Sequence, residues 1–197
     1  MHKKAFIMTK LPHAGINKKR LSKDIDNSKI KRLILNNIEN CKRIFLHKKN
    51  VEFYYYLSKK ENFRSFSFSH NKNFILQTGI DLGEKIWNLK IKVKTSFILF
   101  GSDIPNINMF AIRLAFNILK RHEIVIGPSH DGGFWLIGFA NRNKMSYPFK
   151  KIRWSTHHTL RDLFINLKQQ KINYAITEKL RDIDILDDYC NYNLGFK

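Results

Sequence analysis

The 197-residue sequence predicts a three-layer α/β/α fold built on a mostly parallel central sheet. Segments with strand-like and helix-like apolar spacing alternate along the chain, which is the order that parallel β-α-β units produce. Residues 95–101 (TSFILFG) form a continuous apolar run ending in glycine, as expected of a central strand that is buried on both faces. Because no repeat, low-complexity tract or linker interrupts the alternation, we expect residues 1–197 to form a single domain.

The first half of the chain predicts two strands and two helices. Residues 4–9 are apolar, residues 28–45 carry apolar side chains at helical spacing, and residues 51–58 are β-branched and aromatic. Residues 63–68 hold at most one weak strand. Asp81 stands where an N-cap would begin a short helix.

The second half continues the alternation with a helix over 107–121, strands at 123–127 and 134–139, and a last strand at 173–177. The inward side of the 107–121 helix is expected to comprise Phe110, Ala111, Leu114, Ala115, Ile118 and Leu119. A further helix, with Ser155 or Thr156 as its cap, is expected to carry Leu160, Leu163, Phe164 and Leu167.

The composition excludes a disordered chain and a membrane-spanning one. Hydrophobic residues make up 43% of the sequence, which includes 16 phenylalanines. No apolar run approaches the roughly 18 residues that span a bilayer, so no transmembrane segment is expected. Only two cysteines occur, and Cys41 lies on the apolar side of a helix as a small core residue. We therefore expect a reducing, cytoplasmic location.

The formal net charge of +20 favours anionic partners, namely nucleic acid, phosphorylated metabolites or an anionic membrane surface. The lysines are spread along the chain rather than clustered in one segment. This spread favours a solvated basic surface over a dedicated nucleic-acid interface, so no specific nucleic-acid partner is expected.

Asp103 follows the apolar run that predicts the central strand. In open α/β sheets ligands bind beyond the carboxyl ends of the strands, where a fixed carboxylate suits a hard cation such as Mg²⁺ or Mn²⁺. The alternative is that Asp103 caps a helix beginning near Pro105 or Asn106. Local sequence leaves both interpretations open.

A second acidic group occupies residues 181–189 (RDIDILDDY). Asp182 and Asp184 alternate as at a strand end, whereas Asp187 and Asp188 fall at the start of a short helix, where the helix dipole favours carboxylates. Mg²⁺ is usually held by one or two carboxylates plus substrate phosphates. Asp184 is therefore the candidate second carboxylate beside Asp103.

Residues 127–139 (GPSHDGGFWLIGF) place an acid and two glycines between two apolar runs. The simplest interpretation is a hairpin turn, for which Asp-Gly is a strong signal. The alternative is a substrate-binding loop, in which the glycines allow close approach and Asp131 accepts hydrogen bonds from substrate hydroxyls.

The loop at residues 9–21 (TKLPHAGINKKRL) combines glycine with several cations after the first predicted strand. Such a loop can cradle a diphosphate. It is not a P-loop, because the G-x-x-x-x-G-K-[ST] spacing is absent, and no G-x-G-x-x-G occurs in the chain.

Six blocks in this order carry a family resemblance: 9–21, 76–86 (LQTGIDLGEKI), 97–105 (FILFGSDIP), 124–139 (IVIGPSHDGGFWLIGF), 152–160 (IRWSTHHTL) and 181–189. The chain resembles the radical-SAM/selenodomain-associated transferase 1 family, which has the GT-A, nucleotide-diphospho-sugar transferase fold. That family is similar to 2-phospholactate guanylyltransferase and to metal-dependent glycosyltransferases. The likeness runs across nearly the whole chain and implies a single GT-A-like transferase domain.

The resemblance implies a role for each matching block. Nucleotide binding is implied for Lys10, Gly15, Lys18, Arg20, Asp81 and Gly83. Asp103 and Asp184 match the metal ligands, for Mg²⁺ or Mn²⁺, and Asp103 and Asp131 are the implied catalytic residues. The substrate or acceptor side is implied to be Asp131, Gly132, Gly133, Trp154, Ser155 and Thr156. The chain departs from the family pattern at Lys19, where threonine is usual, and at Lys85, where arginine is usual.

Three functions are consistent with these features. The favoured one is metal-dependent glycosyl transfer from a sugar nucleotide to a small acceptor. The second is nucleotidyl transfer to a phosphorylated small molecule, as in guanylyltransferases. The third is a non-catalytic nucleotide- or nucleic-acid-binding protein, against which the presence of both Asp103 and Asp184 argues.

Overall fold

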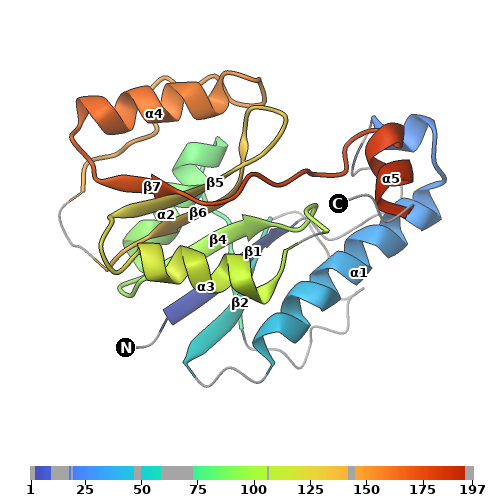
Figure 1. Cartoon of the computed structure of the whole chain (residues 1–197), viewed down its shortest axis with the longest axis horizontal. Helices are drawn as coiled ribbons and strands as arrows, with labels where there is room; N and C mark the ends of the chain where they lie inside the picture. Colours follow the sequence, from blue (N-terminus) through green and yellow to red (C-terminus); the bar gives the residue numbers. More distant parts are fainter. Residues whose placement is uncertain are drawn as a thin grey trace.

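The structure is a computed structural model that describes residues 3–9, 18, 20–46, 50–58, 73–105, 107–141 and 145–193. Within these residues seven strands form one sheet in the order β3-β2-β1-β4-β6-β5-β7 (Figure 1). The strands are β1 (Lys3–Thr9), β2 (Val51–Leu57), β3 (Phe74–Leu76), β4 (Phe97–Gly101), β5 (Ile124–Pro128), β6 (Phe134–Phe139) and β7 (Tyr174–Ile176). Only β6 runs antiparallel to its neighbours, which confirms the predicted mostly parallel sheet.

Helices cover both faces of the sheet. They are α1 (Asn27–Phe45), α2 (Leu82–Lys92), α3 (Met109–Ile118), α4 (Thr159–Gln169) and α5 (Leu186–Asn193), with a short 3-10 helix η1 (Leu21–Lys23) before α1. One buried cluster joins α1 and α3 to the sheet, and a second joins α2 and α4 to its other face. This is the predicted three-layer arrangement.

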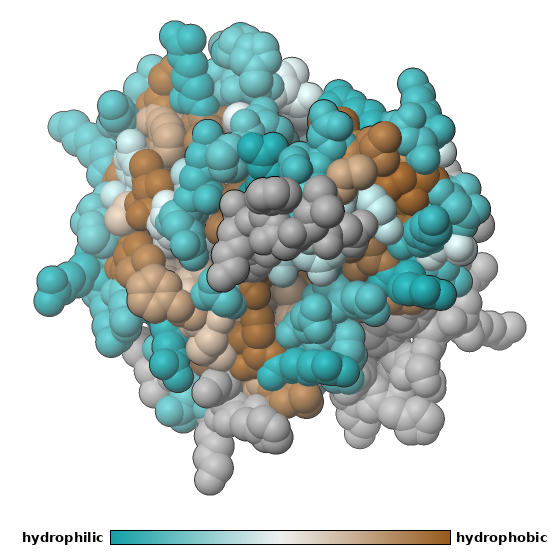
Figure 2. Space-filling model, turned by 45° about the vertical axis from the view of Figure 1, so that its right-hand side comes forward, coloured by the Kyte–Doolittle hydropathy of each residue, from teal (hydrophilic) through white to brown (hydrophobic). Residues whose placement is uncertain are grey.

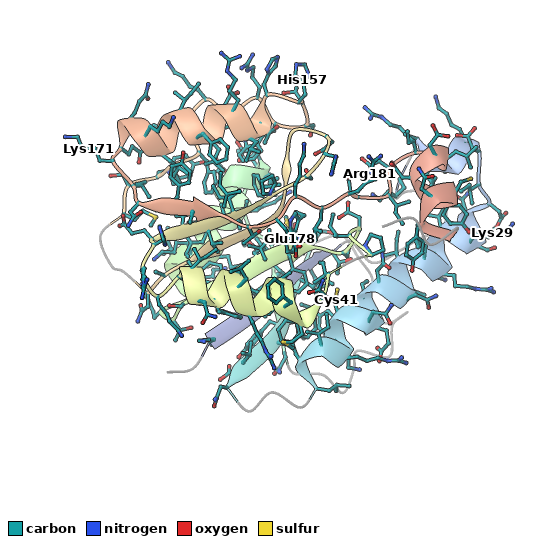
Figure 3. The ribbon with its side chains drawn as sticks, in the orientation of Figure 1. Lys29, Cys41, His157, Lys171, Glu178 and Arg181 are labelled. Atoms are coloured by element: carbon teal, nitrogen blue, oxygen red, sulfur yellow. The ribbon has the colours of Figure 1, made fainter. Side chains whose placement is uncertain are left out.

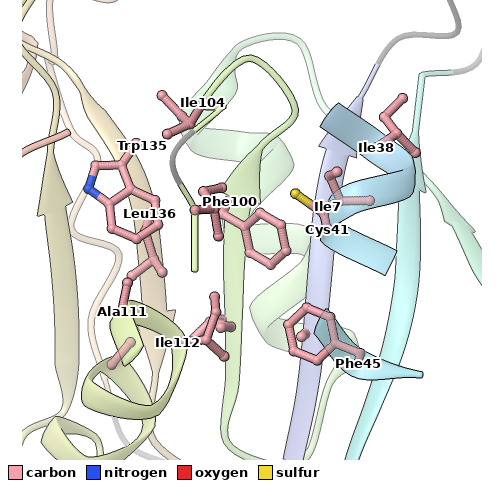
Figure 4. Close-up of a cluster of buried hydrophobic side chains, with 14 of the residues drawn as sticks. Ile7, Ile38, Cys41, Phe45, Phe100, Ile104, Ala111, Ile112, Trp135 and Leu136 are labelled. Carbon is pink, nitrogen blue, oxygen red and sulfur yellow. The ribbon is translucent and has the colours of Figure 1, made fainter. Parts of the chain in front are cut away.

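Alternation along the strands divides the core between the two clusters. In β1, Ala5 and Ile7 pack in the α1–α3 cluster, whereas Phe6 packs in the α2–α4 cluster. Figure 4 shows the first cluster, in which Phe100 of β4 and Phe45 of α1 lie 6.2 Å apart between ring centroids. Cys41 is buried in the same cluster, as predicted.

The interior side of α3 differs from the prediction. Phe110 is 71% exposed, whereas Ile112 and Phe116, which were not expected inside, are buried. Ala111, Ala115 and Leu119 are buried as predicted. The apolar residues of this helix nearly encircle it, so their spacing left the orientation undetermined, and packing against β4 and β5 decided it.

One predicted helix cap is wrong, and the capping interpretation that was left open for Asp103 is excluded. Asn108 caps α3, because its Oδ1 accepts from Ala111 N at 3.0 Å, so Asp103 has no capping role there. The N-cap position of α4 is His158, which makes no side-chain cap, rather than Ser155 or Thr156. The cap at Asp81 is confirmed, with its Oδ1 accepting from Glu84 N at 2.8 Å.

Strands β5 and β6 form an antiparallel hairpin, and the Asp-Gly-Gly segment is its turn. Ser129 N donates to Gly133 O at 3.0 Å across this turn.

The weak strand expected near 63–68 lies outside the described residues, and β3 was not predicted. No helix of the described chain has both the length and the apolar character needed to cross a membrane.

Candidate functional site

A cleft of about 770 Å³ opens at the edge of the sheet where β1 and β4 end and β6 begins. Its lining includes Thr9 and Gly101, the last residues of β1 and β4, then Asp103 just beyond β4, Phe134 at the start of β6, and Asp184 before α5. The carboxyl ends of parallel strands are where open α/β sheets bind ligands. The cleft also has the volume of a small-molecule site.

Three carboxylates converge beside this cleft. Asp103, Asp182 and Asp184 each offer an oxygen, and these oxygens lie within 4.8 Å of one another. The segment between β7 and α5 supplies two of them, and it reaches the end of β4 because Ile183 N donates to Asp103 O at 3.3 Å. Ile183 is buried, so its two flanking aspartates lie on the other side of the segment.

Lys18 neutralises part of this charge. Its Nζ lies 3.1 Å from Asp103 Oδ2 and also donates to Asp184 Oδ1, and its side chain is only 12% exposed. Burial alone lowers the pKa of this ammonium, but the carboxylates of Asp103 and Asp184 outweigh that effect and raise it above its ordinary value. Lys18 therefore stays charged at neutral pH.

Asp182 is the site residue that the sequence left unassigned. Burial raises the pKa of its carboxyl to about 7, and the negative charges of Asp184, Asp131 and Asp103 add to the effect. A signal was present, because Asp182 and Asp184 stand two apart around an apolar residue and so share a face.

The donor set suits a hard divalent cation. Carboxylate oxygens are the ligands that Mg²⁺ and Mn²⁺ accept, and a site of one to three carboxylates leaves positions for substrate oxygens. The Nζ of Lys18 already lies between Asp103 and Asp184, so an ion bridging these two carboxylates requires Lys18 to move.

Asp131 is held by its own turn. Its Oδ1 accepts from Gly133 N at 2.9 Å and from the Ser129 hydroxyl. It does not line the cleft, yet it lies close enough to Asp182 to raise the pKa of that carboxyl. Its catalytic role stays a prediction.

The glycines of the turn differ from each other. Gly132 has a φ of +87°, and a Cβ there would lie 2.4 Å from His157 O. The close contact that requires glycine at this position is therefore with another part of the same chain. At Gly133 a Cβ would meet only side-chain oxygens of Asp131 and Ser129, at 3.2 and 3.3 Å. The substrate role of both glycines stays a prediction.

The Trp-Ser-Thr block divides into packing and cleft residues. Trp154 lies against Gly83, where a Cβ would come within 2.6 Å of the indole, and it does not line the cleft. Thr156 stabilises the local turn by donating to Arg153 O at 2.9 Å. Ser155 does line the cleft, and its φ of +60° is uncommon for a residue other than glycine.

The remaining nucleotide-binding candidates are less closely grouped. Lys10 and Gly15 lie outside the described residues. Arg20 is exposed at the start of η1, and neither it nor Asp81 lines the cleft, although Leu82, Lys85 and Ile86 of α2 do. Gln77, which lines the cleft at the end of β3, gave no signal in the sequence.

Solved structures share this fold. The chain superposes with a TM-score of 0.88 on a protein from Desulfovibrio desulfuricans G20 described as a "putative nucleotide-diphospho-sugar transferase", at 22% identity over 100% of this chain and 89% of that one. CMP:2-keto-3-deoxy-manno-octonic acid synthetase complexed with CTP gives a TM-score of 0.59 at 10% identity, covering 98% and 97%. Rv0371c of Mycobacterium tuberculosis H37Rv, in complex with manganese, gives 0.53 at 12% identity, covering 96% of each chain.

These likenesses confirm the GT-A-like, nucleotide-diphospho-sugar transferase fold expected from the sequence. The chain matches no curated protein. A family model does match residues 45–156, which is more than half of the chain. The chain therefore belongs to the family described as "Uncharacterized protein conserved in bacteria (DUF2064)".

Proposed function

We propose that this protein is a divalent-metal-dependent transferase that transfers a glycosyl group from a sugar nucleotide to a small acceptor. We further propose that it belongs to the radical-SAM/selenodomain-associated transferase 1 branch of its family. The proposal rests on one observation. Three carboxylates lie together beyond the carboxyl end of β4, next to a cleft of about 770 Å³.

Asp103 and Asp184 would hold Mg²⁺ or Mn²⁺, with Asp182 beside them. The ion, when bound, neutralises charge on the donor diphosphate. Lys18, displaced from the carboxylates, would then donate to the same phosphate oxygens, since a charge-assisted bond to phosphate replaces its present ion pairs. Lys10 and Arg20 are the further candidates for these contacts.

The transfer step needs no covalent enzyme intermediate. The acceptor oxygen bonds to the anomeric carbon of the donor sugar while the bond from that carbon to the diphosphate breaks. The nucleoside diphosphate leaves with the electron pair, and the hydroxyl proton of the acceptor passes to a carboxylate. Asp131, in the β5–β6 turn, is the candidate base, because its charge is close enough to the carboxylate group to affect the pKa of Asp182.

Nucleotidyl transfer is the second candidate, and one observation favours it. The second carboxylate of the cluster, Asp184, comes from the segment before the last helix. The resemblance implies that related nucleotidyltransferases use an acid at this position as a second metal ligand. A CTP-bound synthetase is also among the similar solved structures. In this reaction the acceptor attacks the α-phosphorus and pyrophosphate leaves.

A manganese titration with product analysis tests the proposal. Nucleotide affinity is measured with rising Mn²⁺ at fixed ionic strength, for wild type, Asp103→Asn and Asp184→Asn. Both variants should lose the response to Mn²⁺, whereas Asp187→Asn, at an exposed acid in the first turn of α5, should keep it. Identical curves for wild type and Asp103→Asn would refute the metal assignment.

Product analysis then separates the two reactions. Incubation with sugar nucleotides and with nucleoside triphosphates, each beside a mixture of small acceptors, should release nucleoside diphosphate in the first case. Release of pyrophosphate from triphosphates alone would instead identify a nucleotidyltransferase.

A further inference from the structure

A second cavity, of about 420 Å³, adjoins the carboxylate group, because Asp182 is part of its lining. The segment between β7 and α5 forms one wall, α5 forms another, and the β5–β6 turn contributes His130. Asp182 lines this cavity, whereas Asp103 and Asp184 line the cleft. The three carboxylates are thus shared between two neighbouring spaces, two of them lining the cleft and one lining the cavity.

Positively charged side chains gather at this cavity. Lys179 and Arg181 line it together with His130, and Figure 3 shows Arg181 on the segment that leads to α5. The pKa of His130 is lowered by burial and, after that, by the charges of Lys179 and Arg181. Both cations therefore lie close enough to His130 to affect its titration. The positive charge of the cavity is therefore carried mainly by the two longer side chains, Lys179 and Arg181.

Of the two acidic residues that line the cavity, Asp182 and Asp188, neither forms an ion pair with Lys179. The Oδ1 of Asp188 pairs with Arg181 at 3.3 Å, and its Oδ2 accepts the backbone N–H groups of Asp184 and Ile185. Asp188 is thus occupied within its own segment. Among the residues that the structure describes, Lys179 has no ion-pair or hydrogen-bond partner for its ammonium. An ammonium and a guanidinium that line the same cavity favour an anionic ligand there.

We propose that this cavity is the acceptor site, and that it binds a small molecule through a phosphate or carboxylate group held by Lys179 and Arg181. The assignment of the ligand as an acceptor rests on the proposed transferase function. A ligand anchored there by its anionic end would extend past Asp182 toward the group in the cleft. The cavity has room for a molecule the size of a short phosphorylated or carboxylated polyol.

Binding of simple anions, without nucleotide or metal, tests the site separately from the transferase function. The probes are glycerol 3-phosphate and glycerate, with glycerol as the uncharged comparison. The readout is the imidazole NMR signal of His130, assigned from a His130→Asn spectrum, because that ring lines the cavity. Saturable shifts with one or both anions, and none with glycerol, are expected; the anion that binds more tightly identifies the group.

Variants then assign the binding to named side chains. Lys179→Gln should weaken the anion by about tenfold or more, since it removes one charge-assisted hydrogen bond. Arg181→Gln should weaken it similarly. Lys168→Gln, an exposed lysine of α4 away from the cavity, is the control for the general basic charge and should leave the affinity unchanged.

Absence of a saturable His130 shift with either anion would overturn the proposal, as would equal affinities for wild type and Lys179→Gln. Neither result would bear on the manganese titration of the cleft. Conversely, a protein that binds these anions but shows no metal-dependent nucleotide binding would retain the anion site and lose the transferase function.

Discussion

The Nζ of Lys18 lies 3.1 Å from Asp103 Oδ2, at the end of the central strand β4. The same ammonium donates to Asp184, so one lysine from the start of the chain joins two carboxylates from distant segments. In this arrangement the lysine stabilises the carboxylates and also competes with any other cation for them.

Replacing Lys18 by Gln should therefore have opposite effects on two ligands. Mn²⁺ affinity without nucleotide should rise by about tenfold, because a nearby positive charge has been removed from a partly screened site. Nucleotide affinity in the presence of Mn²⁺ should fall by about tenfold, because a phosphate donor is lost. Calorimetric titration measures both constants.

Lys23→Gln is the matched control, since Lys23 is an exposed lysine of η1 with no contact to the carboxylates. It should leave both constants unchanged. If Lys18→Gln weakens Mn²⁺ binding instead, Lys18 supports the metal site rather than competing for it.

Asp131→Asn should separate the charge of this residue from its role in the turn. The amide Oδ1 can still accept from Gly133 N and from the Ser129 hydroxyl, so the free energy of unfolding should change by about 1 kcal/mol or less. Turnover should fall by roughly 10²- to 10⁴-fold if Asp131 is the base. Ser129→Ala removes the hydroxyl that donates to Asp131 but keeps the carboxylate. It should therefore lower the stability and leave the turnover unchanged. Full activity of Asp131→Asn would exclude the base.

Gly132→Ala should destabilise the protein more than Gly133→Ala. At Gly132 a methyl group would strike the backbone of His157 and the φ of +87° is strained for alanine, which together cost about 1–3 kcal/mol. At Gly133 the nearest atoms belong to side chains that can move. Denaturant midpoints compare the two variants, and equal losses would show that the backbone at His157 makes room for the methyl group at little cost.

Asp162 should make stability dependent on acid pH. The Arg153 side chain donates to it at 2.9 and 2.7 Å and the Arg153 backbone at 3.1 Å, which together hold the pKa of this carboxyl well below its usual range. A lowered folded-state pKa contributes stability above the unfolded value of about 3.9, and that stability is lost as pH falls toward the folded value. Asp162→Asn should therefore lower the melting temperature at pH 7 and narrow its difference from wild type below pH about 4. An equal deficit at both pH values would contradict this.

The sequence was sufficient for most of the elements because apolar spacing reports burial directly. The long helix α1 and the strand β4 stand close to their predicted bounds. Three-residue β3 was missed, because so short a strand has no periodicity of its own and exists through pairing with β2. The orientation of α3 was missed because both of its sides are apolar.

The candidate site was predictable where it depends on strand ends and not where it depends on contacts between distant segments. Asp103 could be placed from the apolar run before it. The spacing of Asp182 and Asp184 puts both on one face of their segment. That this face lies beside Asp103 depends on the Ile183–Asp103 backbone hydrogen bond, which local sequence does not show. The place of Trp154 against Gly83 is likewise a tertiary contact. Figure 2 shows hydrophilic side chains over most of one face with hydrophobic patches between them, so composition alone could not single out the cleft.

The place of β6 between β4 and β5 has a consequence for how the chain folds. Among the sheet pairings of the described residues, only the β5–β6 hairpin joins two strands through a short turn, whereas β4 pairs with the distant β1, as in the register of Phe6 with Leu99. Local pairings close small loops and form early, and distant ones wait for the intervening chain to order. We expect the hairpin to form first and the seam between β1 and β4 to close late. Until it closes, two of the most apolar strands keep unpaired edges, so refolding yield should fall steeply with protein concentration.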